Sequence, residues 1–429
     1  MNQALIGDRA RAIGLRTLKR AAGAVTRLVP ISTPVLLVGP GSAARLGRAV
    51  ADFGHRRVLL VTDAVVMELG LTASLTDALA AAGVQVTVFA AVTADAPIPV
   101  IEQGLALYAS HACEAIVAFG GGSVMDAAKV IGLAAANDKP PRQLVGYFRG
   151  RHGPAPIYAV PTTAGTGSEV TVAAIISDPE AGTKMMVADS RLVPEMAALD
   201  PTLMTGLPPA VTAATGMDAL THAVEACISG WANDTTDRWA LAAAGMIWEH
   251  LPRAWRDGND LHSREQMALA STYAGLAFTR ANVGNVHAIA HQLGGRYHVP
   301  HGLANAIMLP PVLRFSLPDA APRLARLARH VGIAGRGDTV LARRFVDAVQ
   351  ALGDALQIPR TLDALREEDL DALATAACHE ADFNYPVPRR MTPADCVALL
   401  RQALPAAPRP RKPRVQRRAA ASSKATISG

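Results

Sequence analysis

The chain has 429 residues, of which half are hydrophobic, and its formal net charge is +6. This length exceeds what one hydrophobic core usually organises, so we expect two main domains. No uninterrupted apolar run reaches the roughly 18 residues that a membrane-spanning helix needs. The composition therefore predicts a soluble protein with no membrane partner.

The positive charge is concentrated at the two ends of the chain. Residues 1–30 carry +5 and residues 406–429 carry +7, so residues 31–405 have a net charge of −6. Such basic ends could bind nucleic acid phosphates. Aromatic residues make up only 4% of the chain, however, and none lies among the tail arginines to stack on bases. Nucleic-acid binding is therefore the less favoured interpretation.

The first 30 residues and the last 24 lie outside the expected domains. Apolar residues between Leu15 and Val29 recur at helical spacing beside basic ones, which predicts an amphipathic helix. Packing on the body or against a second copy is favoured over membrane binding, and we expect a homodimer or a higher homo-oligomer. The Pro- and Arg-rich segment 406–429 predicts a disordered tail.

The four cysteines are widely scattered and form no Cys-x-x-Cys pair. This pattern argues against a disulfide framework or a zinc ribbon and fits a reducing cytoplasm. The N-terminal segment has no apolar core followed by a cleavage site, so we expect no secretory signal. An organellar transit peptide is the alternative interpretation of its arginines.

Short apolar runs alternate with helical stretches from Pro34 to about residue 206. This alternation predicts an α/β domain with a parallel sheet, whose ligands collect at the carboxyl ends of the strands. The expected strands are Val35–Val38, Val58–Val61, Val84–Phe89, Ala115–Phe119 and Ile157–Val160.

Long Ala/Leu-rich stretches replace these runs after Leu207. We therefore expect an α/β domain over residues 31–206 and an all-helical domain over residues 207–405. The tandem prolines Pro208 and Pro209 suit the junction because they interrupt a helix and favour its start. The expected helices are Val211–Ser229, Thr235–Ile247, Arg264–Phe278, Ala321–Val331 and Leu341–Leu352.

Two polar loops follow the last two expected strands. Ala115–Phe119 leads into Gly120-Gly121-Gly122-Ser123, where glycines and free helix-start amides could approach a pyrophosphate. Ile157–Val160 leads into a loop with four hydroxyl side chains and two glycines, residues 161–169. Either loop alone fits a tight or well-capped turn, but the two together favour a nucleotide site.

Asp63 follows the strand Val58–Val61. A carboxylate there could bond the adenosine ribose and repel a 2′-phosphate, which favours NAD over NADP. The alternative is that Asp63 only forms a turn.

Asp218 and His222 stand four residues apart in a predicted helix and so share one face. His287 and His291 have the same spacing, and His298 and His301 follow them closely. A carboxylate with imidazoles suits a divalent metal, although an isolated pair could be an ion pair. Spacing alone does not choose which of the four histidines are ligands.

These segments resemble the iron-containing, or group III, alcohol dehydrogenases, which share the dehydroquinate-synthase-like fold. The resemblance runs from about Val35 to Leu404. Its motifs are Gly120-Gly121-Gly122-Ser123-x-x-Asp126-x-x-Lys129, the loop Pro161–Glu169, Gly216-x-Asp218-Ala219-x-x-His222, His287-x-x-x-His291-x-x-Gly294 and Pro300-His301-Gly302-x-x-Asn305. The segments before residue 31 and after residue 405 lie outside it.

The resemblance implies two sets of site residues. The implied metal ligands, for Fe²⁺ or else Zn²⁺, are Asp218, His222, His287 and His301, with His291 beside the metal but not bound to it. The implied contacts to the cofactor, NAD with NADP as the alternative, are Asp63, Gly121, Gly122, Ser123, Thr162, Thr163, Thr166 and Lys184.

The implied reaction is hydride transfer between nicotinamide and a small uncharged alcohol or aldehyde. His291 is then a candidate proton relay, or a residue that only supports the ligands. The alternatives are a dehydroquinate-synthase-like lyase or cyclase, or a related dehydrogenase of polyols or hydroxy acids. A phosphorylated sugar acid would need clustered basic residues, whereas the residues around the metal motifs are mainly Ala, Val, Ile and Gly, with Arg296 the nearest basic residue.

Overall fold

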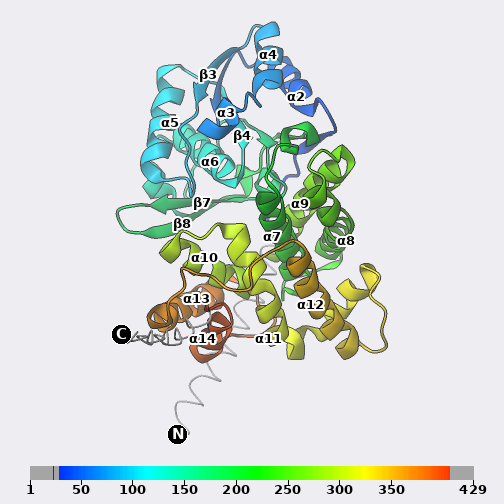
Figure 1. Cartoon of the computed structure of the whole chain (residues 1–429). Helices are drawn as coiled ribbons and strands as arrows, with labels where there is room; N and C mark the ends of the chain where they lie inside the picture. The colour runs from blue at the N-terminus through cyan, green and yellow to red at the C-terminus, as the bar shows by residue number, and fades with distance from the viewer. Residues whose placement is uncertain (1–22, 24–28, 406–429) are drawn as a thin grey trace, which may run out of the picture.

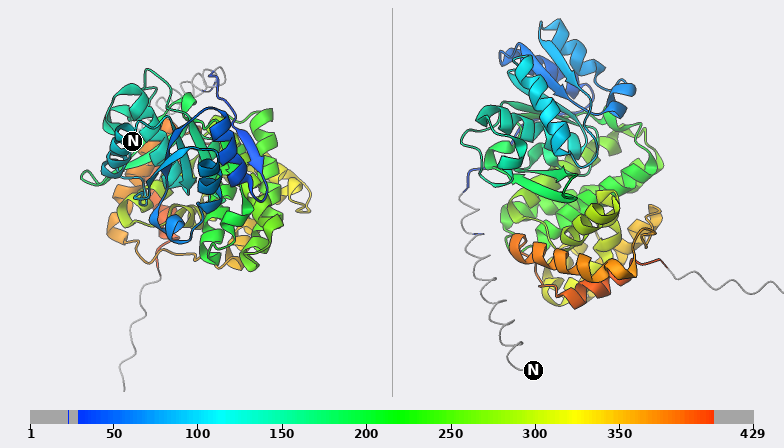
Figure 2. Two further views of the ribbon diagram at one scale, coloured as in Figure 1. Left: turned by 90° about the horizontal axis from the view of Figure 1, so that it is seen from above. Right: turned by 90° about the vertical axis from the view of Figure 1, so that its left-hand side faces the viewer.

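The computed structural model describes residue 23 and residues 29–405. Apart from residues 23, 29 and 30, the predicted amphipathic helix lies outside the described residues, as does the predicted tail. The described chain forms an α/β half stacked on a helical half (Figures 1 and 2). The expected fold class is confirmed, whereas the division near residue 206 into separate domains stays a prediction.

A six-stranded parallel sheet organises the α/β half, in the order β1-β9-β6-β4-β2-β3. Its strands are β1 (Val35–Val38), β2 (Arg57–Val61), β3 (Gln85–Phe89), β4 (Ala115–Gly120), β6 (Ile157–Pro161) and β9 (Met196–Leu199). All five predicted strands are present. The sixth, β9, was missed because Met-Ala-Ala-Leu contains no β-branched residue, the usual mark of a strand.

Helices cover both faces of this sheet, which is why its central strands are continuously apolar. On β2, Val58 and Leu60 pack toward one core cluster, whereas Leu59 and Val61 pack toward another. The first face carries α2 (Ser42–Asp52) and α4 (Ala73–Ala81), and the second carries α5 (Ile98–Ser110) and α6 (Gly122–Asn137). Residues Ala64–Glu68 form the short helix α3.

The chain reverses its direction of travel across the sheet between β2 and β4. After β2 it continues outward to the edge strand β3, and it then returns to pair β4 with the other side of β2. Ligands of parallel sheets bind at such a switch point, beyond the carboxyl ends of the strands. Asp63 and the glycine loop that follows β4 both lie at this edge.

A second, three-stranded sheet lies between the two halves (Figure 1). It contains β5 (Gly146–Tyr147) and the antiparallel hairpin of β7 (Ala173–Asp178) and β8 (Thr183–Ala188), and β8 packs beside α10. This sheet was not predicted from the sequence: β5 has only two residues, and β7 and β8 are only partly buried, so they lack the continuous apolar character of the other predicted strands. Short 3₁₀ helices occur at Pro141–Leu144, Ser168–Val170, Ser190–Leu192, Pro201–Met204 and Glu367–Asp369.

The helical half is built around α7 (Pro209–Ile228), which packs against α8, α9 and α11. Pro209 is the first residue of α7, the position where proline is best tolerated. The other helices are α8 (Asp234–Arg256), α9 (Leu261–Ala281), α10 (Asn285–Tyr297), α11 (His301–His330), α12 (Asp338–Ala355), α13 (Leu370–Asn384) and α14 (Pro393–Arg401). Among the described residues, no helix combines the length and the apolar character needed to cross a bilayer.

The helix α11 is much longer than expected. The sequence predicted only Ala321–Val331, whereas the helix begins at His301 and contains Pro310, Pro311, Pro318 and Pro322. Each proline removes one backbone hydrogen bond, but one side of α11 is buried in the largest core cluster. Tertiary packing therefore overrides the local signal, and it fixes His301 at the start of a well-anchored helix.

Candidate metal centre and dinucleotide cleft

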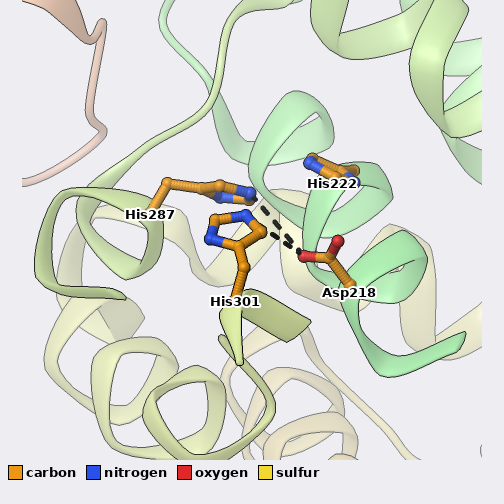
Figure 3. Close-up of side chains that lie close together, drawn as sticks. All are labelled: Asp218, His222, His287 and His301. Carbon is orange, nitrogen blue, oxygen red and sulfur yellow. Dashed lines mark ion pairs between the residues drawn. The ribbon is translucent and has the colours of Figure 1, made fainter. Parts of the chain in front are cut away.

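Four side chains from three helices converge at one point of the helical half. Asp218 and His222 project from α7, His287 from α10 and His301 from the start of α11 (Figure 3). Each offers one ligand atom, and these atoms all lie within 4.8 Å of one another. The Oδ1 of Asp218 is 4.0 Å from the Nε2 of His287 and 3.7 Å from the Nε2 of His301.

A glycine lets α11 approach α7 closely enough to form this cluster. A Cβ atom at Gly302 would lie 2.5 Å from the carbonyl oxygen of Ala214. Any larger residue would therefore push the start of α11 away from α7. His301 directly precedes Gly302, so the same contact places its imidazole opposite Asp218.

The environment keeps the imidazoles neutral. Burial lowers the pKa of His222 to about 4 and lowers the pKa values of His287 and His301 well below their usual value. Neutral imidazoles have a free lone pair, as metal ligands require. The Nδ1 of His222 is buried without a hydrogen-bond partner. Three neutral nitrogen donors and a carboxylate in one buried cluster fit a divalent cation such as Fe²⁺ or Zn²⁺.

Two further residues orient the cluster. The Nδ1 of His287 lies 2.6 Å from the Oε2 of Glu225, so its Nε2 faces the other ligands. Burial raises the pKa of Glu225 to about 7. The amide of Asn305 donates to the Oδ1 of Asp218 at 2.6 Å. Glu225 was missed, although it follows Asp218 and His222 at the i, i+4, i+7 spacing of one helix face.

His291 lies beside the cluster and belongs to a separate network. Its ring centroid is 5.3 Å from that of His301, and its Nδ1 lies 2.6 Å from the Oε1 of Glu380 on α13. The same carboxylate accepts hydrogen bonds from Tyr385 and Gln292. His298 is outside both groups and ends α10. No pattern in the sequence pointed to Glu380, because it lies 89 residues from His291.

The two predicted nucleotide loops lie side by side at the carboxyl edge of the sheet. Gly121 directly precedes α6 and Gly122 is its first residue. A Cβ atom at Gly122 would come within 2.7 Å of Thr166, whereas one at Gly121 would meet only Thr163, at 3.6 Å. Thr162 is buried, and its amide donates to the carbonyl of Gly120. The cradle at Gly121 is therefore open to a ligand.

Other residues of the family motifs hold this edge together. Lys129 is completely buried and donates to the hydroxyls of Ser168 and Thr171. Asp126 accepts from Ser168 and from the amide of Ile175. These contacts join α6 to the second loop and to β7. Asp126 and Lys129 thus have partners within the protein rather than facing the cleft.

The remaining predicted cofactor residues lie around the same cleft. The Oδ1 of Asp63 accepts a hydrogen bond from the amide of Val66 and caps α3. This oxygen therefore has the turn-forming role that was the alternative to a ribose contact. The hydroxyl of Ser123 accepts from the amide of Asp95. The ammonium of Lys184 on β8 lies 2.6 Å from the Oδ1 of Asp95.

A large open cavity of about 1450 Å³ lies between the β7–β8 hairpin, α10 and α13. Its walls include His291, Glu380 and Tyr385 on the side nearest the four-residue cluster, and Lys184 and Met186 on the hairpin side. Arg296 is the basic residue nearest to the metal motifs in the sequence, but the fold also brings Lys184 to this cavity from a distant segment. Arg296 is paired with Asp369.

Known proteins with similar sequences share this architecture. The chain is 37% identical over 374 residues to alcohol dehydrogenase 4 of Saccharomyces cerevisiae (strain YJM789), covering 86% of this chain and 97% of that protein. It is 38% identical over 371 residues to 1,3-propanediol dehydrogenase of Klebsiella pneumoniae, covering 85% and 96%. A crystal structure of 1,3-propanediol oxidoreductase superposes with a TM-score of 0.85 at 38% identity, covering 87% of this chain and 99% of that chain.

Two family models together cover nearly the whole described chain. The model for iron-containing alcohol dehydrogenase matches residues 33–201, and the model for the C-terminal part of the Fe-containing alcohol dehydrogenase family matches residues 212–404. The expected resemblance is therefore confirmed. The chain belongs to the iron-containing alcohol dehydrogenase family and is an oxidoreductase of that family.

Proposed function

We propose that this enzyme interconverts a small uncharged alcohol and its aldehyde, with NAD as hydride carrier and Fe²⁺ at the four-residue cluster, Zn²⁺ being the alternative metal. The observation that carries the proposal is the convergence of three neutral imidazoles and a carboxylate beside the open cavity. When bound, the cation would act as a Lewis acid toward the substrate oxygen and the nicotinamide would exchange the hydride.

The residues of the two halves take different parts in this reaction. The amides at the start of α6, behind Gly121 and Gly122, are placed to bind a pyrophosphate. The hydroxyls of Thr162, Thr163 and Thr166 and that of Ser123 offer neutral hydrogen bonds to the cofactor. His291 exchanges the alcohol proton with solvent, and Glu380 holds its imidazole in place.

An assay of metal content beside turnover tests the assignment of the ligands and of His291. We expect Asp218→Ala and His301→Ala to lose bound metal and turnover while NADH binding persists. His291→Asn should keep the metal and lose roughly a hundredfold in turnover. The control is His298→Asn, a histidine of the same segment outside the cluster, which should behave as wild type.

Three outcomes would each contradict one part of the proposal. Full metal occupancy in both Asp218→Ala and His301→Ala would remove the cluster as the metal site. Metal-loaded protein that produces no NADH from a panel of primary alcohols and diols would remove the activity itself. Normal turnover in His291→Asn would leave that residue a supporting role only.

The preference for NAD rests on Asp63 at the end of β2. Its Oδ1 caps α3, and its carboxylate lies at the switch point where an adenosine ribose would bind. We expect Asp63→Gly to narrow the ratio of NAD to NADP efficiency, because the repulsion of a 2′-phosphate is removed. An unchanged ratio, measured from kcat/KM with each cofactor, would contradict this role.

The wider setting of the enzyme is also a proposal. All four cysteines are free thiols, which supports a reducing cytoplasm as its location. A homodimer or higher homo-oligomer stays a prediction, and sedimentation of the full chain would test it.

A further inference from the structure

An ion pair connects the α/β half to the hairpin at the rim of the cavity. Asp95, in the loop between β3 and α5, lies 2.6 Å from the ammonium of Lys184 on β8. The Lys184 side chain is only 18% exposed, whereas that of Asp95 is 37% exposed. Lys184 lines the cavity, and the carboxylate of Asp95 is the direct partner of its ammonium.

The surrounding backbone fixes where this pair lies. The amide of Asp95 donates to the hydroxyl of Ser123 in the first turn of α6, and the amide of Ser177 on β7 donates to the carbonyl of Ala96. Asp95 adopts a left-handed conformation with φ of 65°, which aspartate tolerates better than most residues. The loop is thus anchored both to the glycine loop and to the hairpin.

The pair also lies close to the helix that carries two of the histidines. The Nζ of Lys184 would be 3.4 Å from a Cβ atom at Gly294, on α10. The same helix carries His287 and His291. The two charges therefore lie between the glycine loop on one side and α10, which carries His287 and His291, on the other.

A dinucleotide has to cross this interval if the proposed function holds. Its pyrophosphate would lie at Gly121 and Gly122, and its reacting ring would face a substrate at the metal cluster. The ring of NAD⁺ carries a positive charge and that of NADH carries none. An unpaired lysine here would therefore disfavour the oxidised form, an unpaired aspartate would favour it, and the ion pair does neither.

We propose that Asp95 and Lys184 form a charge-balanced pair, in which each charge cancels the bias that the other alone would give to the relative affinity for NAD⁺ and NADH. Asp95 is then a specificity-determining residue that acts through its charge and its hold on Lys184. This inference rests on the proposed function, because it requires the cofactor in this cleft.

Equilibrium binding without substrate tests the pair independently of turnover. The dissociation constants of NAD⁺ and NADH would be measured by calorimetry and by nucleotide fluorescence, on the zinc-loaded full chain. The variants are Asp95→Asn, Lys184→Met and the double variant. Glu180→Gln removes an exposed charge in the turn between β7 and β8 and is the matched control.

The expected shifts have opposite signs. Asp95→Asn should weaken NAD⁺ relative to NADH by roughly tenfold, and Lys184→Met should strengthen NAD⁺ relative to NADH by a similar factor. The double variant and Glu180→Gln should keep the wild-type ratio. If the amine of Lys184 also bonds the cofactor, Lys184→Met weakens the binding of NAD⁺ and NADH alike. The ratio of their dissociation constants then still reports the effect of the charge alone.

Several results would overturn the proposal. These are unchanged ratios in both single variants, shifts of the same sign, or equal weakening of both forms throughout. Asp95→Glu and Lys184→Arg, which keep the charges, should retain the wild-type ratio and cover the case in which a neutral variant fails to fold. Wild-type protein that binds neither nucleotide would overturn the proposed function as well, whereas binding with unchanged ratios overturns only the pair.

Discussion

Replacement of Glu225 by glutamine is the sharpest test of how the protein orients the side chains of the proposed metal site. The carboxylate of Glu225 accepts three buried hydrogen bonds: from the amide of Gly284 at 2.8 Å, from the amide of Val286 at 2.7 Å and from the Nδ1 of His287 at 2.6 Å. Both oxygens are used, and glutamine offers only one. At least one N–H group would then face the N–H of the new amide.

The structure sets the magnitude of the loss. A buried donor left without an acceptor costs about 1–3 kcal/mol. If His287 loses its partner, its ring is no longer held with Nε2 toward Asp218, and loss of such support typically lowers metal affinity about 10–100-fold. That range corresponds to about 1.4–2.7 kcal/mol, in agreement with the cost of one unpaired donor.

A zinc titration in competition with a chromophoric chelator measures this affinity directly. Glu249→Gln is the control, because Glu249 is exposed on α8 and pairs with Arg253 of the same helix. NADH binding and the melting temperature of the metal-free protein report whether Glu225→Gln still folds. A folded Glu225→Gln protein with wild-type zinc affinity would refute the role of Glu225 in orienting His287.

Two further predictions concern the cofactor half. Gly121→Ala should melt like wild type, because Gly121 is not in a left-handed conformation and a new Cβ atom meets only Thr163, at 3.6 Å. The variant should nevertheless bind NADH at least about tenfold more weakly, because the added methyl group occupies the place of the pyrophosphate. Unchanged NADH binding would place the pyrophosphate elsewhere. Burial lowers the pKa of Lys129 to about 8, from an ordinary value of 10.5. Between these two pH values the folded state therefore binds fewer protons than the unfolded state, so the free energy of unfolding should rise with pH. From pH 8 to 10.5 the rise should reach up to about 3 kcal/mol relative to Lys129→Met, as measured by denaturant unfolding. Parallel pH profiles of the two proteins would contradict this.

Local patterns in the sequence were sufficient for the fold class, and they indicated much of the candidate site. Continuous apolar strands followed by glycine or hydroxyl loops predicted the parallel sheet and its ligand edge. The four-residue spacing of Asp218 and His222 predicted a shared helix face. Resemblance to a family, rather than spacing, selected His287 and His301 and set His291 apart; the fold places the selected four together and leaves His291 beside them.

Only the tertiary structure decided which distant side chains meet. The contacts of His287 with Glu225, His291 with Glu380 and Lys184 with Asp95 span 62, 89 and 89 residues. Such contacts depend on how helices and loops pack against one another. The hydrophobic periodicity of a single strand or helix, of 2 or 3.6 residues, carries no information about this packing. Packing also stabilises α11 as a helix despite its four internal prolines, and it stabilises Met196–Leu199 as a strand despite the absence of β-branched residues. The sequence thus determined the elements and their chemical groups, whereas burial of shared apolar faces determined which groups lie within bonding distance.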